Sequence, residues 1–274
     1  MEATVLQDNF AVRIDGIDLS TLDGDDLAEA KKLWMENKIA IFTGQDLDDD
    51  GLLAFTGRLG PLFVHVQQNI LGDGPDEVMY MSSMDAVAPV AGDLAWHSDQ
   101  SYTPGPVFAT ILYGITIPED GGNTLFADLT ATYECLPDYL RAKVDNVKAC
   151  YSPVKKGRPR RRPMKDDQID ELSDIWHPLV RKHPYLDRKA LYLSPNHMTR
   201  IGDLSEEDSD ALLEELIIHA SKFVYSHRWT PGDVIMWDNT QVMHRRDSFP
   251  STQPRFHKRT GFHLPEELRT PVTA

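Results

Sequence analysis

Residues 108–127 read FATILYGITIPEDGGNTLFA and give the clearest indication of the fold. The mainly apolar and β-branched run from Phe108 to Ile117 predicts one long strand. The cluster Pro118–Asn123 contains the proline and glycines typical of a turn, and Thr124–Ala127 then resumes an extended pattern. Strands joined by Gly/Pro turns of this kind are typical of a double-sheet β fold.

The remaining elements extend this pattern. Further strands are predicted at Ile39–Phe42, Val78–Met81, Phe223–Trp229, Val234–Trp237 and Arg255–Leu264. Helices are predicted around Leu27–Trp34, over Leu52–Arg58, over Thr130–Val144, and after Ser205, which with Asp208 forms a capping sequence. No Gly-rich strand-to-helix loop of a doubly wound α/β fold is present. We therefore predict a mainly β fold, a double-stranded β-helix (jelly roll) core with helical decoration, in a single domain spanning 1–274.

Composition excludes several classes of protein. The chain has 274 residues, of which 41% are hydrophobic, and a net charge of −15, which disfavours binding to nucleic acid. No apolar run reaches the ~18 residues of a membrane span, and the N-terminal residues do not resemble a secretory signal. Cys135 and Cys150 form no CxxC pair. We expect a cytoplasmic protein with reduced cysteines.

One segment, residues 155–165, opposes the acidic balance. It reads KKGRPRRRPMK. A solvated loop and a lid that attracts an anionic substrate are both consistent with it. A nucleic-acid patch is disfavoured because no aromatic residue interleaves the arginines.

His97 and Asp99 lie two positions apart in the sequence AWHSDQS, residues 95–101. On an extended strand such residues point to the same side, where an imidazole and a carboxylate can bind one metal ion. His244 could complete a face of two histidines and one carboxylate, which leaves three positions open on an octahedral ion. A bare His-x-Asp sequence is also common in surface or capping pairs, so the surrounding residues decide its meaning.

The last predicted strand alternates basic and apolar side chains. Period two places Arg255, His257 and Arg259 on one face, and Phe256 and Phe262 on the other. The basic face could be solvated, or it could line the mouth of a barrel and receive carboxylates, which suit the planar guanidinium of arginine. The pattern alone leaves both interpretations open.

Together these residues resemble the taurine dioxygenase/2,4-dichlorophenoxyacetate dioxygenase (TauD/TfdA) family of Fe(II)- and 2-oxoglutarate-dependent oxygenases. The resemblance covers most of the chain. The matching blocks are Gly16–Leu19, Ile41–Gln45, Gly60–Leu62, Trp96–Asp99, Gly121–Asp128, His177–Arg181, Gly232–Asn239, and His244 followed eleven residues later by Arg255. Several blocks in the family's order are far more specific than any one of them.

The resemblance implies a role for each matching residue near the metal. His97, Asp99 and His244 are expected to hold the iron. Arg255 and the Thr124 hydroxyl are expected to bind the far carboxylate of 2-oxoglutarate, whose keto acid end chelates the metal. A buried carboxylate without a cationic partner would be costly, so a cation is required there.

The resemblance also suggests substrate-binding residues. Arg259 matches the position that binds the substrate's acidic group in this family. His65 and His197 fall where relatives have pocket residues, or they are loop histidines without a ligand role, because pocket loops vary in length.

The family's chemistry implies that dioxygen and 2-oxoglutarate are consumed, succinate and carbon dioxide are released, and a small organic acid is hydroxylated. A hydroxylated carbon that bears an ether or sulfonate would then lose that group by C–O or C–S cleavage. The blocks Ala127–Asp128 and His177–Arg181 favour an aryloxyalkanoate over taurine or another alkylsulfonate.

Two further alternatives remain, a non-catalytic jelly-roll binding module with an inherited metal site and a zinc hydrolase. The hydrolase would leave the arginine at the co-substrate position without a role. We expect a homo-oligomer by analogy with relatives, and no nucleic-acid or membrane partner.

Overall fold

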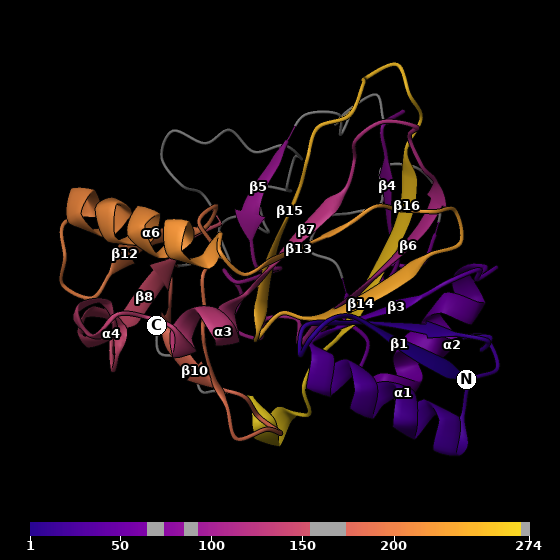
Figure 1. Cartoon of the computed structure of the whole chain (residues 1–274), viewed down its shortest axis with the longest axis horizontal. Coiled ribbons are helices and arrows are strands. Elements are labelled where there is room, and N and C mark those ends of the chain that lie inside the picture. Colours follow the sequence, from indigo (N-terminus) through magenta and orange to yellow (C-terminus); the bar gives the residue numbers. More distant parts are fainter. Residues whose placement is uncertain (65–73, 85–92, 154–173, 270–274) are drawn as a thin grey trace.

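The computed structural model describes residues 1–64, 74–84, 93–153 and 174–269, and most of its regular structure is β (Figure 1). The strands are β1 (Glu2–Gln7), β2 (Ala11–Asp15), β3 (Ile39–Phe42), β4 (Met79–Ser82), β5 (Leu94–His97), β6 (Ala109–Thr116), β7 (Thr124–Asp128), β8 (Lys148–Tyr151), β9 (Ile175–Pro178), β10 (Val180–Lys182), β11 (Lys189–Leu191), β12 (Met198–Ile201), β13 (Val224–His227), β14 (Val234–Asp238), β15 (Val242–Arg246) and β16 (Phe256–Phe262). The helices are α1 (Gly24–Asn37), α2 (Asp49–Leu59), α3 (Leu129–Glu134), α4 (Asp138–Val144), α6 (Glu206–Ala220) and the 3-10 turn η1 (Glu266–Leu268).

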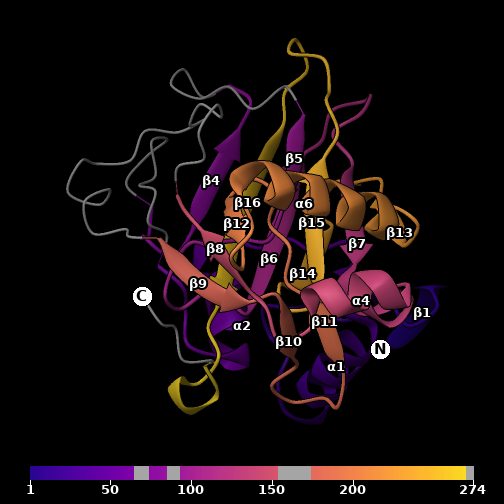
Figure 2. The ribbon, with the colours of Figure 1, turned by 90° about the vertical axis from the view of Figure 1, so that its left-hand side faces the viewer.

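Two sheets form the centre of the molecule. The larger has seven strands in the order β1-β2-β3-β14-β6-β16-β4, and the smaller has four in the order β13-β7-β15-β5. Neighbouring strands in both are antiparallel except the parallel pair β2–β3. The sheet β12-β8-β9 and the pair β10-β11 lie on the side of α4 and α6 (Figures 1 and 2).

Alternation along the strands divides the core into layers. Ile39 and Ile41 pack with Phe126 of β7 between the two large sheets. Ala40 and Phe42, on the other face of β3, pack in the cluster that includes residues of α1 and α2. A third cluster joins the outer face of the four-stranded sheet to α3, α4 and α6. Helices therefore cover the outside, and the space between the sheets is left for side chains of both.

Most predicted elements are confirmed to within a few residues. The long strand from Phe108 is β6, which pairs with both β14 and β16 in the seven-stranded sheet. Ser205 caps α6, because its hydroxyl accepts a hydrogen bond from the Asp208 amide at 3.1 Å. The mainly β fold class is confirmed as well.

The single helix predicted over Thr130–Val144 is wrong. The segment forms two short helices, α3 and α4, with Pro137 as the N-cap of α4. Proline has no amide hydrogen and disfavours the helical conformation of the residue before it, so a helix ends there. The helical spacing of apolar residues continues across Pro137, so the sequence pattern did not indicate that the helix is interrupted.

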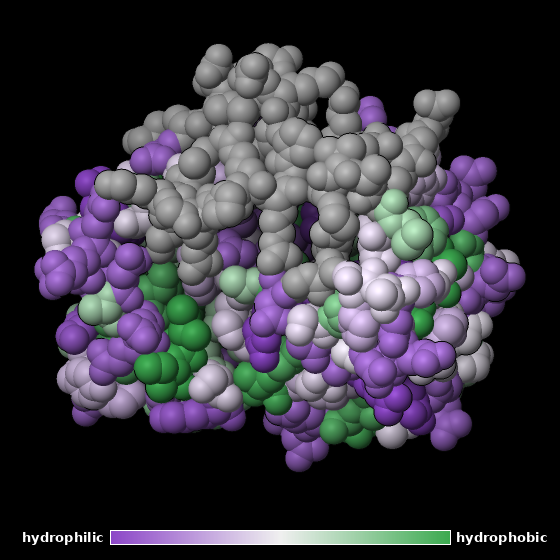
Figure 3. Space-filling model, turned by 90° about the horizontal axis from the view of Figure 1, so that it is seen from above, coloured by the Kyte–Doolittle hydropathy of each residue, from purple (hydrophilic) through white to green (hydrophobic). Residues whose placement is uncertain are grey.

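Within the described ranges, no helix is both long and apolar enough to cross a membrane. The described residues that are visible from above form a mainly hydrophilic surface, with smaller apolar patches between (Figure 3). The basic segment 155–165 lies outside the described residues.

Candidate active site

Two candidate metal ligands lie opposite each other on neighbouring strands. His97 ends β5, and its register partner on β15 is His244. The two imidazole centroids are 4.2 Å apart, and both side chains are buried. An antiparallel pair brings directly opposed side chains close together, so the register itself sets this spacing.

Asp99 completes the cluster from a turn. The expectation that His97 and Asp99 share one extended strand is wrong, since β5 ends at His97 and Asp99 lies in the turn that follows. The carboxylate still reaches both rings. Its Oδ1 is 3.7 Å from the His97 Nε2, and its Oδ2 is 3.9 Å from the His244 Nε2. One ligand atom from each residue lies within 4.8 Å of the other two.

This donor set fits a divalent metal ion. An ion bonded at about 2.1 Å to each donor needs donors at most about 4.2 Å apart, and the distances from the carboxylate to both imidazoles satisfy this limit. The His97 Nδ1 lies 2.9 Å from the Ala95 carbonyl oxygen, a hydrogen bond that leaves Nε2 free to bind metal. Burial lowers the pKa of both imidazoles, to about 3 for His244, which keeps them in the neutral form that binds metals.

Asp99 is ionised despite its burial. Burial alone would raise its pKa, but the charge of Arg259 and the hydrogen bond from the Thr110 hydroxyl hold the pKa below its usual value. The Arg259 guanidinium contributes an ion pair, with its Nη1 3.2 Å from the Asp99 Oδ1. A buried carboxylate with two neutral imidazoles is a donor set suited to Fe(II).

The basic face of β16 points into the molecule. Arg255 and His257 are buried, and Arg259 reaches the metal-binding cluster. The interpretation of this face as solvated is therefore wrong. The Nε of Arg255 has no hydrogen-bond partner among the described residues. Burial, followed by repulsion from Arg246, lowers the pKa of Arg255 to about 9, so an anion bound here would stabilise the charged guanidinium.

Thr124 lies beside this face at the start of β7. It is opposite Arg246 on β15, and its hydroxyl accepts a hydrogen bond from the Trp229 Nε1 at 3.0 Å. The neighbouring Gly122 has a positive φ of 70°, and a Cβ added there would lie 3.6 Å from the Arg255 Nε. The Gly121–Asn123 turn thus brings Thr124 and Arg255 to the same end of the space between the sheets.

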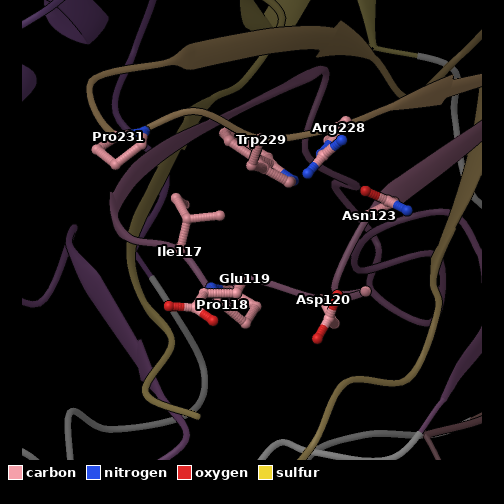
Figure 4. A pocket seen from close by; sticks show the side chains of 9 residues that line it. Ile117, Pro118, Glu119, Asp120, Asn123, Arg228, Trp229 and Pro231 are labelled. Carbon is pink, nitrogen blue, oxygen red and sulfur yellow. The ribbon is translucent and has the colours of Figure 1, made fainter.

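A cavity of about 430 Å³ is lined in part by this turn, through Gly121 and Asn123 (Figure 4). Ile117, Arg228 and Trp229 are among the residues that line it, and none of the three metal-binding candidates does. The cavity borders the expected carboxylate site instead, because Trp229 also donates a hydrogen bond to Thr124.

Comparison with known proteins identifies the family. The family model described as "Taurine catabolism dioxygenase TauD, TfdA family" matches residues 2–260. The chain belongs to the TauD/TfdA family. The protein is accordingly an oxidoreductase, a dioxygenase that depends on Fe(II), 2-oxoglutarate and dioxygen.

Relatives of the TauD/TfdA family match almost the whole chain. The alpha-ketoglutarate-dependent 2,4-dichlorophenoxyacetate dioxygenase of Cupriavidus pinatubonensis is 31% identical over 264 residues, covering 89% of this chain and 91% of its own. The (S)-phenoxypropionate/alpha-ketoglutarate-dioxygenase of Sphingobium herbicidovorans is 30% identical, covering 91% and 90%. The crystal structure of AAD-2 in complex with Mn(II) and N-oxalylglycine superposes with a TM-score of 0.82 at 29% identity, covering 97% and 98%.

Of the two histidines suggested as TauD/TfdA pocket residues, His197 and His65, only His197 belongs to the described residues. His197 lies near the loop that carries Asp99, with its Nδ1 3.3 Å from the Ser101 Oγ and its ring centroid 4.6 Å from that of Tyr102. His65 lies outside the described residues. A substrate role for either one stays a prediction.

Sequence reasoning missed the residues that hold Asp99 in place. The Thr110 hydroxyl of β6 donates to the Asp99 Oδ2 at 2.7 Å and accepts from the Asn239 Nδ2 at 2.9 Å. The Asn239 Oδ1 in turn accepts from the Asp99 amide at 3.3 Å. Asn239 ends a matched block, but Thr110 carries no motif, and only the pairing of β6 with β14 brings them together.

Replacing Thr110 tests this support. Thr110→Val keeps the shape of the side chain but removes its hydrogen bond to Asp99, so we expect Fe(II) affinity to fall by about tenfold. Anaerobic metal titration by calorimetry measures the change. Thr56→Val, which removes a buried hydroxyl bonded to Leu52 within α2, is the matched control. Equal affinity in the Thr110 and Thr56 variants would exclude the supporting role.

Proposed function

We propose that this dioxygenase hydroxylates a small organic acid of the aryloxyalkanoate type. In this proposal His97, Asp99 and His244 hold the iron, and Arg255 and Thr124 bind the far carboxylate of 2-oxoglutarate. The acid group of the substrate is bound by Arg259. The same geometry would also serve an alkylsulfonate such as taurine, which is the second candidate substrate.

One observation carries the co-substrate assignment. Arg255 is a buried cation whose Nε has no hydrogen-bond partner in the described part of the chain, and four residues later Arg259 pairs with Asp99 of the three-donor cluster. A buried unpaired charge is costly and implies an anionic ligand. A 2-oxo dicarboxylate has one end suited to each group. A zinc hydrolase or a non-catalytic module would leave this guanidinium without a function.

The bound iron and 2-oxoglutarate would supply the oxidising chemistry. The chain's own residues would bind and orient the reactants. The two neutral histidines and the ionised Asp99 give a net charge of −1, so a ferrous site keeps positive charge that attracts a dianionic co-substrate. Thr110 and Asn239 fix the carboxylate of Asp99. The apolar core between the sheets keeps water from the reacting groups.

Arg259 supports the choice of an acidic substrate. Its guanidinium is largely buried and lies 3.2 Å from the Asp99 Oδ1, beside the metal-binding cluster. A planar guanidinium pairs with carboxylates in two parallel hydrogen bonds, which would hold an acid at a fixed distance from the iron. Two relatives are named for phenoxy acids, which favours the aryloxyalkanoate reading.

A screen for succinate release tests the proposed substrate. The purified protein with Fe(II), 2-oxoglutarate and dioxygen is given aryloxy acids, sulfonates, sulfate esters and phosphonates in turn. We expect the largest stimulation of succinate formation by an aryloxy acid. Stimulation by sulfonates alone would replace the first candidate with the second.

Replacing Arg259 tests its role in substrate binding. Arg259→Gln removes the cation, so we expect the KM for the aryloxy acid to rise by about tenfold or more, with a smaller change in the KM for 2-oxoglutarate. Lys258→Gln is the control, because Lys258 lies on the same strand but pairs with Asp49 at 2.8 Å, outside the site. Equal KM values for the acid in both variants would refute the assignment.

Four further features stay predictions. We propose that the two large sheets form a double-stranded β-helix and that residues 1–274 form one domain. The homo-oligomeric state and the cytoplasmic location are expectations from the sequence.

A further inference from the structure

His257 is a buried polar side chain with no use in the roles described so far. It lies on β16 between Arg255 and Arg259, on the face that points into the molecule, and its exposed fraction is 0%. Neither its Nδ1 nor its Nε2 has a hydrogen-bond partner among the described residues. Buried polar groups are nearly always hydrogen-bonded, so two unpartnered nitrogens on one ring require an explanation.

The surroundings of His257 are those of the expected carboxylate site. Its ring lies edge-on to Trp229, with centroids 4.7 Å apart and planes at 90°. The same indole donates its Nε1 hydrogen to Thr124. Trp229 fits there because its neighbour on β6 is Gly114, where an added Cβ would lie 2.8 Å from the indole. One indole ring therefore contacts both His257 and the hydroxyl expected to bind 2-oxoglutarate.

Positive charge surrounds the ring. Burial first, then Arg255, Arg246 and His227, hold the pKa of His257 well below its usual range. The imidazole is therefore neutral at pH 7 and carries one N–H donor. A carboxylate in this place would accept from that N–H and balance the charge of the two arginines.

We propose that His257 binds 2-oxoglutarate, donating a hydrogen bond to the far carboxylate beside Arg255 and Thr124. This inference rests on the proposed co-substrate site. A bound carboxylate explains why this buried position holds an imidazole. An apolar side chain could fill the same space without leaving polar atoms unpartnered. It also makes His257 a determinant of co-substrate choice, because the bond exists only for 2-oxo acids with a second carboxylate.

Direct binding tests the proposal without turnover. Calorimetry under anaerobic conditions measures the Kd of 2-oxoglutarate and of 2-oxopentanoate for the Mn(II)-loaded protein. The second acid has the same keto acid end but a methyl group in place of the far carboxylate. For His257→Met we expect the Kd of 2-oxoglutarate to rise about tenfold, with that of 2-oxopentanoate and of Mn(II) unchanged. His257→Gln, which keeps an N–H donor, should recover part of the loss.

Control variants distinguish a failure of the His257 role from a failure of the proposed co-substrate site. His219→Met removes a buried imidazole of α6 whose Nε2 has no partner among the described residues, and it should leave both Kd values unchanged. Equal weakening of both acids in His257→Met would show a packing role and overturn the proposal, as would an unchanged Kd for 2-oxoglutarate. If Arg255→Met also leaves that Kd unchanged, the co-substrate site itself is wrong. If only Arg255→Met weakens binding, the site stands and the role of His257 fails.

Discussion

His97→Ala is expected to abolish succinate formation. The substitution removes one of three donors from a cluster in which Asp99 and His244 alone would hold the metal weakly. We expect turnover to fall by roughly a thousandfold, since both the bound metal and the orientation of its open positions are lost. Succinate release with 2-oxoglutarate measures the activity, and elemental analysis of the purified variant measures the iron content.

His219→Ala serves as the control for this experiment. It removes a buried histidine of α6 whose Nε2 has no partner within the described ranges, and it lies outside the metal-binding cluster. We expect this variant to bind iron and form succinate like the wild type. If His97→Ala retains its iron and its turnover, the assignment of the metal ligands is refuted.

Arg255→Met is expected to have opposite effects on binding and on stability. Loss of the guanidinium should raise the KM for 2-oxoglutarate by about 100-fold, because a desolvated charge pair is lost. The free energy of unfolding of the ligand-free protein should increase by about 1 kcal/mol, since a buried guanidinium whose Nε has no hydrogen-bond partner among the described residues is replaced by an apolar chain. Steady-state kinetics and urea unfolding measure the two effects.

The KM and the free energy of unfolding together distinguish a binding role of Arg255 from a structural one. A raised KM with lower stability would show that Arg255 is also a structural residue. An unchanged KM would remove Arg255 from the co-substrate site. Arg200→Met, which removes a guanidinium stacked on Trp176 at 4.9 Å, is a control for the general effect of losing an arginine.

Local patterns predicted the elements with strong periodicity. The strand Ile39–Phe42 and the cap at Ser205 depend on neighbouring residues, and both are found where the sequence placed them. The strands β1, β2, β8 to β12 and β15 were not predicted. The burial of β1 shows no strict alternation, and β10 and β11 have only three residues each, too short for a periodic signal.

Residues of the candidate site could be predicted where a local motif marks them. Contacts that depend on how strands pair could not. Spacing and family blocks identified Arg255 and the three metal-binding candidates. The direction of the basic face was not decided by its own alternation, because burial depends on what packs against it. Thr110 contacts Asp99 because of the register that pairs Thr110 with Trp237 of β14. The sequence of one strand alone does not determine such a register.

The expected carboxylate site takes Thr124 from the four-stranded sheet and Arg255 from the edge of β16 in the seven-stranded sheet. A molecule bound there would contact both large sheets and hold them together. By mass action, the folded population would then grow with the concentration of 2-oxoglutarate. The stability of the enzyme would thus depend on the supply of its co-substrate, even when no substrate is present to be oxidised.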